Sequence, residues 1–423
     1  TINNPELLTP AQYRLMAEAG FTKALALYEG RSGHKQNFID VWTRYKAGAA
    51  TIEDVKAAVA LVNADCETDA LKALDVAERY GIKYYVLNNL FFEMITNSAF
   101  DKEDYETLVG LFFENNGYTG KGAYAGNFLQ DEPSADSTEA LEKVKAAAEA
   151  YLALYPNGEP YVNLLPGGAT NAKYTAYLDY YFDNLAGLLG YASFDDYVLD
   201  VNGKSYSISE YHLSNLMQVA SRVKSYNDAN VADIALRTYV YALSQNESGH
   251  DNRAISSVND IRFQVYSALC FGSTEFTYYC YAPSSASETD KQSGLIDFYT
   301  GETTDVYGWA KTVNNEVHVF ESALTGFKWK GVMTHDYKKY FWESSNKQFK
   351  QIESSKLSSY KGIAGIGGNV DCLTGVFEDA SGNDAYVIMN YGDPKTAGSG
   401  KVEVTLNDAT HALVYVNGER TLE

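Results

Sequence analysis

The sequence has little cysteine and histidine, and it lacks several motifs that mark common enzyme classes. Its four cysteines show no CxxC spacing, so neither a zinc site nor a disulfide framework is indicated, and Cys270 and Cys280 are expected to be buried small apolar residues. The six histidines form no HxH or HExxH pair, which argues against a metal cage. GxSxG and GxxxxGK[ST] are missing too, so a serine-hydrolase elbow and a phosphate-binding loop are not expected.

Positive charge and long apolar runs are also scarce. Lys and Arg number 34 against 55 Asp and Glu, a net charge of −21. An acidic surface repels nucleic acid and anionic membranes, so neither is an expected partner. No run approaches the roughly 20 apolar residues that cross a bilayer. The sequence starts at Thr1 rather than Met, for which a removed signal peptide is one explanation and a cloning boundary is another.

Tyrosine, in contrast, is abundant. There are 35 Tyr against 19 Phe and 4 Trp in the 423 residues. A tyrosine offers a flat apolar face and a hydrogen-bonding tip, which suits the binding of sugar rings. For any single tyrosine, half-buried packing is the more common use.

Short apolar runs alternate with amphipathic helical stretches along most of the chain. Helical patterns cover 138–155 and 208–226, and glycines that can end a helix precede several of the runs. The apolar runs are 21–27, 82–88, 127–130, 161–165, 191–199, 234–243 and 275–281. Strands that alternate with helices in this way indicate βαβ units and a parallel sheet.

The alternation predicts a (β/α)8 TIM barrel over residues 1–330. Seven runs are visible and the barrel needs eight, so the first strand is expected at or before residues 1–4, with 127–130 as the fourth strand. An open doubly wound sheet is the alternative. The barrel is favoured because no glycine-rich phosphate loop follows the first strand.

The pattern changes after residue 283. Residues 293–327 are typical of a loop followed by a long helix. From about residue 345 short alternating runs are separated by Gly, Asn and Asp, as hairpins require. We therefore predict a small antiparallel β-sandwich domain at 340–423.

The stretch GNFLQDEPS, residues 126–134, ends an apolar run with two adjacent acids and a proline. In a TIM barrel the catalytic residues lie at the carboxyl ends of strands, which is where Asp131 and Glu132 fall. Pro133 removes a ladder donor and helps to end the strand. The acids could instead cap the next helix, but four other residues there can do so: Ser134, Asp136, Ser137 and Thr138.

A second carboxylate is expected across the barrel mouth, because glycoside hydrolysis needs one protonated acid and one ionised carboxylate. Glu247 follows the run 234–243, and Asp195 lies late in the run 191–199. Glu275 opens the last strand, so a structural role at the bottom of the barrel is expected for it.

Over roughly residues 10–325 the chain resembles the TIM-barrel glycoside hydrolases of clan A, the β-galactosidase and cellulase-like enzymes. The segment GNFLQDEP resembles their fourth-strand motif, which implies that Glu132 is the general acid/base. Asp131 stands where that motif usually has an Asn that hydrogen-bonds the sugar 2-hydroxyl. The resemblance further implies a nucleophile after the seventh strand, where Glu247 is the nearest acid, and a secreted bacterial protein.

The sequence thus predicts a glycoside hydrolase that retains the anomeric configuration if Glu132 pairs with Glu247. Asp195 is the reserve second carboxylate, and pairing with it would make inversion possible. No cofactor is implied, the partner is a carbohydrate, and the oligomeric state is left open. A non-catalytic carbohydrate-binding barrel is the alternative, and a metal-dependent barrel hydrolase is a further one. Candidates for contacting the sugar are Asp131, Asn88, Tyr197, Gln245, Tyr281, His250 and Trp309.

Overall fold

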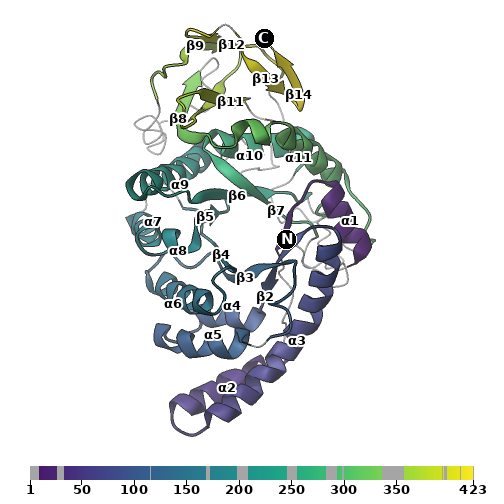
Figure 1. The fold of residues 1–423 in the computed structure, drawn as a ribbon, viewed down its shortest axis with the longest axis vertical. Coiled ribbons are helices and arrows are strands. Elements are labelled where there is room, and N and C mark those ends of the chain that lie inside the picture. The colour runs from purple at the N-terminus through teal and green to yellow at the C-terminus, as the bar shows by residue number, and fades with distance from the viewer. Residues whose placement is uncertain are drawn as a thin grey trace. The chain divides into compact units, whose positions relative to one another are not determined.

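The structure is a computed structural model with a mixed α/β fold (Figure 1). It describes residues 9–25, 33–114, 116–167, 172–197, 208–244, 255–282, 293–297, 300–335, 357–392, 394, 398–409 and 411–422. Contacts divide the chain into two compact units. The first contains residues 1–165, 176–190 and 281–285, and the second contains residues 166–175, 191–280 and 286–423.

The first unit is built on a four-stranded parallel sheet in the order β1-β2-β3-β4. Helices α3, α4 and α6 pack against these strands (Figure 1). The strands are β1 (Lys23–Leu25), β2 (Lys83–Leu87), β3 (Tyr124–Asp131) and β4 (Glu159–Asn163). The helices are α1 (Pro10–Glu18), α2 (Lys35–Lys46), α3 (Ile52–Arg79), α4 (Asn89–Thr96), the 3-10 helix η2 (Lys102–Asp104), α5 (Tyr105–Phe113), α6 (Glu139–Leu154), α7 (Ala172–Asn184) and α8 (Ala186–Leu189).

The second unit begins with a three-stranded parallel sheet, β5-β6-β7. Helix α9 packs on β5 and β6, and α10 packs on β6 and β7. These strands are β5 (Tyr191–Phe194), β6 (Ala235–Tyr241) and β7 (Ser273–Tyr279), and the helices are α9 (Ile208–Asn230), α10 (Val258–Cys270) and α11 (Asp305–Leu324).

Seven strands and the helices between them confirm the predicted alternation. Each of the seven apolar runs overlaps one strand, and every pairing within the two sheets is parallel. The glycines at 20, 81, 190 and 272 have φ values from 70° to 84°, which is the left-handed conformation of a helix cap. Closure into an eight-stranded barrel stays a prediction, and its expected first strand at residues 1–4 lies outside the described residues.

Antiparallel sheets follow in the second unit, as expected for the C-terminal region. They pair in the orders β11-β10-β8, β12-β9 and β13-β14. Strand β8 was not predicted, and it begins before the predicted boundary at 330–340. The strands are β8 (Lys328–His335), β9 (Ile363–Gly368), β10 (Cys372–Glu378), β11 (Asp384–Asn390), β12 (Val402–Leu406), β13 (Leu413–Val416) and β14 (Glu419–Leu422).

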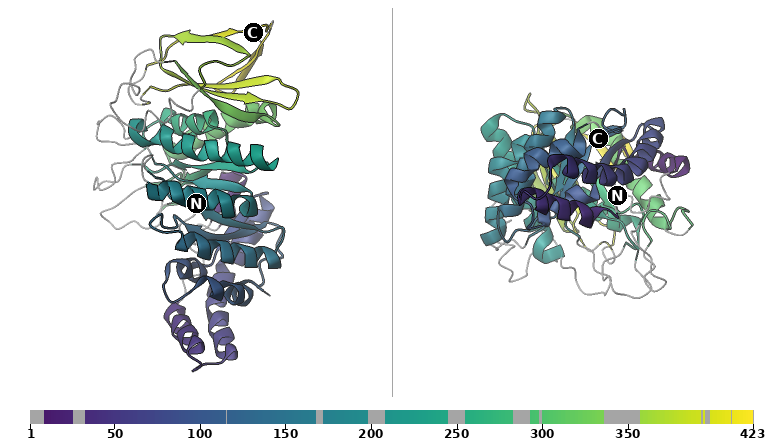
Figure 2. Two further views of the ribbon diagram at one scale, coloured as in Figure 1. Left: turned by 90° about the vertical axis from the view of Figure 1, so that its left-hand side faces the viewer. Right: turned by 90° about the horizontal axis from the view of Figure 1, so that it is seen from below.

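Two of the antiparallel sheets share an apolar core. Met333 of β8, Ile363 of β9 and Val376 of β10 are buried together, with Ile366, Tyr386 and Leu406 packed around them. The left view of Figure 2 shows these strands as a layered group at the C-terminal end of the chain. Facing sheets with a shared core are the arrangement of a sandwich.

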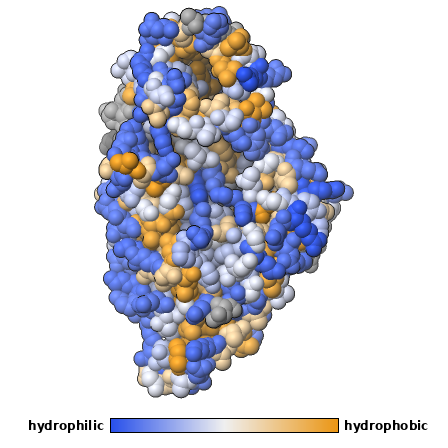
Figure 3. Space-filling view, in the orientation of Figure 1, coloured by the Kyte–Doolittle hydropathy of each residue, from blue (hydrophilic) through white to orange (hydrophobic). Residues whose placement is uncertain are grey.

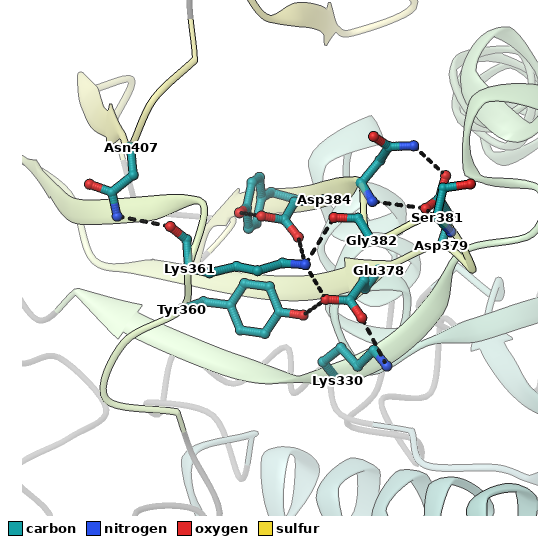
Figure 4. Close-up of polar contacts among 11 residues, drawn as sticks. Lys330, Tyr360, Lys361, Glu378, Asp379, Ser381, Gly382, Asp384 and Asn407 are labelled. Carbon is teal, nitrogen blue, oxygen red and sulfur yellow. Dashed lines mark hydrogen bonds and ion pairs between the residues drawn. The ribbon is translucent and has the colours of Figure 1, made fainter.

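A polar cluster ties the strand ends of these sheets together (Figure 4). The Lys361 ammonium contacts Glu378 Oε2 at 2.5 Å and Asp384 Oδ1 at 3.5 Å. The Tyr360 hydroxyl donates to Glu378 Oε2 at 2.8 Å, and Asn407 Nδ2 donates to the Lys361 carbonyl at 2.9 Å. The hydrogen bond from Lys361 lowers the pKa of Glu378, so this carboxyl stays ionised and keeps its partners.

Helix α10 also contacts the antiparallel sheet through β10 and β11. Its Cys270 thiol is close to the carbonyls of Leu373 and Val387, and a side chain at Gly375 would come within 2.4 Å of the Cys270 oxygen. All four cysteines are free and buried, as predicted for Cys270 and Cys280. Burial raises the pKa of the Cys270 thiol to about 12, which makes it an inert packing residue.

The face of the molecule shown in Figure 3 is mostly hydrophilic. Hydrophilic residues spread over the face shown in Figure 3, with hydrophobic residues in small groups between them. In the described part of the chain, no helix is both long enough and apolar enough to cross a membrane.

A buried ion pair joins α10 to α11. Arg262 Nε donates to both oxygens of Glu316 at 3.1 Å, and Glu316 is 4% exposed. We expect Arg262→Ala to lower the free energy of unfolding by about 2–4 kcal/mol, because it leaves a buried carboxylate without its cation. Thermal or urea unfolding measures the change. Lys328→Ala removes an exposed partner of Asp233 and is the control, with little change expected. Equal effects of the two variants would contradict this role.

Candidate active site

The predicted acid pair lies at the carboxyl end of the first parallel sheet. Asp131 is the last residue of β3 and is in register with Asn163, the last residue of β4. The Asn163 side chain donates to Asp131 Oδ1 at 3.1 Å, and the Glu132 backbone N–H donates to the Asn163 carbonyl at 2.9 Å. One residue of β4 therefore fixes both members of the pair. The predicted position at a strand end is confirmed for both acids.

The backbone before and at the pair is irregular. The register with β4 shifts between Phe128 and Gln130, which marks a bulge in β3. Glu132 has a φ of 44°, a left-handed conformation that is rare for a residue with a side chain. Such strain costs about 1–3 kcal/mol and is concentrated at functional sites, where bulges also re-aim side chains. The backbone is therefore irregular both just before and at the acid pair.

The two carboxyl groups have different environments. Glu132 is exposed and Asp131 is half-buried. The pKa of Asp131 is raised to about 6, mainly by burial and to a smaller extent by the charge of Glu132, while the hydrogen bond from Asn163 lowers it. Adjacent acids whose environments differ in this way can divide the roles of acid and base.

Buried amide side chains surround this strand end. Asn127, Gln130 and Asn163 are at most 2% exposed. Gln130 Nε2 donates to the Asp131 carbonyl at 3.2 Å, while Gln130 Oε1 is buried and has no hydrogen-bond partner in the described part of the chain. A buried acceptor without a donor costs about 1–3 kcal/mol, so this oxygen needs a donor from outside the described residues.

Asn88, a predicted sugar contact, directly follows β2 and is 1% exposed. Its Oδ1 accepts from the Phe91 N–H at 3.1 Å and its Nδ2 donates to Asn63 Oδ1 at 3.2 Å. The side chain thus caps α4 and links it to α3. Its contact with a sugar stays a prediction.

Three tyrosines meet at the carboxyl end of the second unit's parallel sheet. The Tyr197 ring lies 5.2 Å from Tyr241 and 5.6 Å from Tyr279, between ring centroids. Tyr241 and Tyr279 are register partners at the ends of β6 and β7. Of these three, only Tyr197 was predicted to bind sugar. The other two lie inside apolar runs, where sequence alone cannot separate a core ring from one at the strand end.

A hydrogen-bonded series that was not predicted follows β5. His212 Nδ1 lies 2.9 Å from Asp196 Oδ2, and its Nε2 lies 2.8 Å from Ser267 Oγ. Ser267 is fully buried and donates to the Gln264 carbonyl at 3.0 Å. The order Asp-His-Ser is that of a hydrolase triad, but a substrate cannot reach an enclosed serine. The series instead holds α9 and α10 to the segment after β5, and no sequence spacing marks it.

The other predicted residues are placed as follows. Asp195 follows β5 in the second unit and is 5% exposed, and Trp309 is half-buried on α11. Tyr281 is buried, and its hydroxyl donates to Gln12 Oε1 at 2.7 Å. Glu247, Gln245 and His250 lie outside the described residues.

Glu275, expected to be structural, lies on β7 opposite Arg237 of β6. Its carboxylate is 3.5 Å from Arg237 Nε, and the Arg237 guanidinium lies 3.9 Å from the ring centre of Tyr191. This ion pair, at the early half of both strands, fits a role in holding the sheet.

No protein-family model and no curated protein matches the chain. Glycoside hydrolases are among the solved structures that are similar to it. A glucosidase from Croceicoccus marinus is 15% identical with a TM-score of 0.45, and covers 72% of this chain and 63% of its own. A β-galactosidase from the psychrophilic Marinomonas ef1 is 11% identical with a TM-score of 0.46, and the match covers 76% of this chain and 59% of the β-galactosidase. TsXylA, an intracellular xylanase from Thermoanaerobacterium saccharolyticum, is 12% identical with a TM-score of 0.42, and the match covers 73% of this chain and 93% of the xylanase.

The chain thus spans less than two thirds of the first two of these proteins. With TM-scores below 0.5, the similarities by themselves assign it neither a topology nor an activity. The function has to be inferred from its own strand ends.

The pKa of Asp131 makes stability depend on pH. An ordinary Asp has a pKa of about 3.9, so the folded state with a value of about 6 binds the proton more tightly. Stability is fullest below about pH 4 and falls as the pH rises through 6. We expect Asp131→Asn to be more stable than wild type by on the order of 1–3 kcal/mol at pH 7.5, and to lose this advantage at pH 4.

Unfolding at both pH values measures the difference. Asp183→Asn, at an exposed position of α7, is the matched control and should show no such pH-dependent gain. A gain of the same size in both variants would mean that the environment of Asp131 is not responsible.

Proposed function

We propose that the chain is a glycoside hydrolase in which Glu132 is the general acid/base. The observation that carries the proposal is the carboxyl pair at the end of β3. Asp131 has a raised pKa, and Glu132 is exposed in a strained backbone conformation. Cleaving a glycosidic bond needs a proton donor beside the leaving oxygen and a second group that stabilises the positive charge at C1. Two acids with different environments at one strand end suit that task.

A (β/α)8 barrel is the fold we propose for residues 1–330, with a β-sandwich at 340–423. The support is that both parallel sheets follow the βα order, and that a barrel presents its catalytic residues at strand carboxyl ends. The acid pair and the tyrosines Tyr197, Tyr241 and Tyr279 all lie at such ends. The tyrosine faces suit stacking on sugar rings.

For a second carboxylate on the protein, the sequence offers Glu247 and Asp195. Asp195 is 5% exposed, which disfavours direct contact with a sugar or an attacking water. Glu247 is therefore the better of the two as a protein nucleophile. A secreted bacterial enzyme that acts on a carbohydrate is the setting we propose, and a carbohydrate-binding protein without catalysis is the alternative.

Removing the proton donor should have an effect that depends on the leaving group. We expect Glu132→Gln to lower kcat/KM by about 100- to 10,000-fold for alkyl glycosides, which need protonation of the leaving oxygen. Dinitrophenyl glycosides leave without a proton, so their cleavage should change by less than about tenfold. The two kinetic series measure this split.

Glu106→Gln, at an exposed site on α5, is the control and should match wild type on both series. Wild-type activity of Glu132→Gln on alkyl glycosides would rule out the proposed role. A wild-type protein that binds sugars and cleaves none would support the non-catalytic alternative.

The stereochemistry of the product tests the type of mechanism. We expect the first sugar released to keep its anomeric configuration, because two successive displacements at C1 restore it. Proton NMR of the reaction in its first minutes detects this anomer before it mutarotates. An inverted product would require a water held between two carboxyl groups and would exclude a retaining enzyme.

A further inference from the structure

The end of β3 offers hydrogen-bond acceptors and few donors. Asp131 carries a half-buried carboxyl group, and Glu132 carries an exposed one. Gln130 is 2% exposed, and its amide reaches along the strand, since Nε2 donates to the Asp131 carbonyl at 3.2 Å. That bond leaves Gln130 Oε1 buried beside the acids with no partner in the described part of the chain. A ligand that satisfies this strand end must bring donors of its own.

The two carboxyl groups interact with each other. They belong to consecutive residues, and the charge of Glu132 acts on the Asp131 carboxyl. Two interacting groups at one strand end suit neighbouring atoms of one sugar better than opposite faces of its ring. With Glu132 at the leaving oxygen on C1, Asp131 is next to the substituent on C2.

An ionised carboxylate accepts hydrogen bonds and donates none. A C2 substituent that donates to it carries either an O–H or an N–H, and one whose N–H belongs to an amide also brings a carbonyl oxygen. Such a substituent is an acetamido group, and its carbonyl oxygen is itself placed to attack C1. Nucleophilic attack by a group of the substrate itself is one of the known exceptions to the two-carboxylate mechanism of glycosidases.

We propose that the chain cleaves β-glycosides of 2-acetamido sugars, with the acetamido oxygen of the substrate as the nucleophile, Asp131 as the acceptor of its N–H, and Glu132 as the general acid/base. This inference rests on the proposed glycosidase function. Gln130 Oε1 accepts a further donor of the same sugar. The bond from Asn163 to Asp131 Oδ1 holds the carboxylate in place.

The reaction balances in two steps. In the first, the acetamido oxygen bonds to C1, the bond from C1 to the leaving oxygen breaks, and Glu132 gives its proton to that oxygen. The Asp131 carboxylate accepts a hydrogen bond from the N–H, which keeps its proton, while positive charge develops on the resulting oxazolinium. In the second, Glu132 takes a proton from water, the water oxygen bonds to C1, and the bond from C1 to the acetamido oxygen breaks. Retention follows from the two displacements.

The experiment compares matched aryl β-glycosides on the full chain. The 4-nitrophenyl glycosides of 2-acetamido-2-deoxyglucose and 2-acetamido-2-deoxygalactose are set against those of glucose and galactose. We expect kcat/KM to favour the acetamido substrates by at least about 1,000-fold, because only they carry the nucleophile. Trifluoroacetamido analogues, whose carbonyl oxygen is a weaker nucleophile, should react at least about tenfold more slowly than the acetamido substrates.

Variants separate the roles. Asp131→Asn should lower kcat for the acetamido substrates by about 100- to 1,000-fold, because the charge that stabilises the oxazolinium is lost. Glu106→Gln is the control for the assay. A thiazoline that mimics the oxazoline should inhibit the wild type and should bind Asp131→Asn more weakly. This inhibitor arm gives a readout that does not depend on turnover.

The outcomes are distinguishable. Cleavage of glucosides or galactosides without a preference for acetamido sugars overturns this inference and leaves the glycosidase function standing. Loss of all activity in Glu247→Gln has the same meaning, because it would show that the nucleophile is a residue of the protein. No cleavage of any glycoside in either series by the folded wild type overturns the proposed function itself.

Discussion

The hydrogen bonds between the ends of β3 and β4 set the geometry on which the proposed chemistry depends. Asn163 accepts from the backbone of Glu132 and donates to the carboxyl of Asp131. A single residue thus fixes where the strand stops and how one acid is held. The bulge before Gln130 and the left-handed Glu132 are tolerated because these bonds over-determine the local backbone.

The two parallel sheets use their carboxyl ends differently. In the first unit that edge is lined by amides and carboxyl groups, with Gln130 and Asn163 buried. In the second unit the rings of Tyr197, Tyr241 and Tyr279 meet at the corresponding edge. Polar groups suit bond cleavage and flat rings suit sugar stacking. The carboxyl ends of the two sheets thus carry different kinds of side chain.

Sequence reasoning found what local patterns encode. Apolar runs and cap glycines located seven strands, and the end of one run located Asp131 and Glu132. It missed strand β8 (Lys328–His335), which directly follows the predicted long helix and lies where no element was predicted. It also missed the contacts of His212 with Asp196 and Ser267, because these join residues up to 55 positions apart. The bulge and the unpartnered Gln130 oxygen depend on register, which residue type does not reveal.

The position of α10 between two kinds of sheet has a consequence for the origin and engineering of the C-terminal strands. One side of the helix packs on β6 and β7 and another on β10 and β11, with Gly375 admitting the backbone at Cys270. Deleting the antiparallel sheet would expose this apolar side of α10, and such a surface drives aggregation. These strands are therefore an integral wall of their unit rather than an accessory that can be exchanged between enzymes.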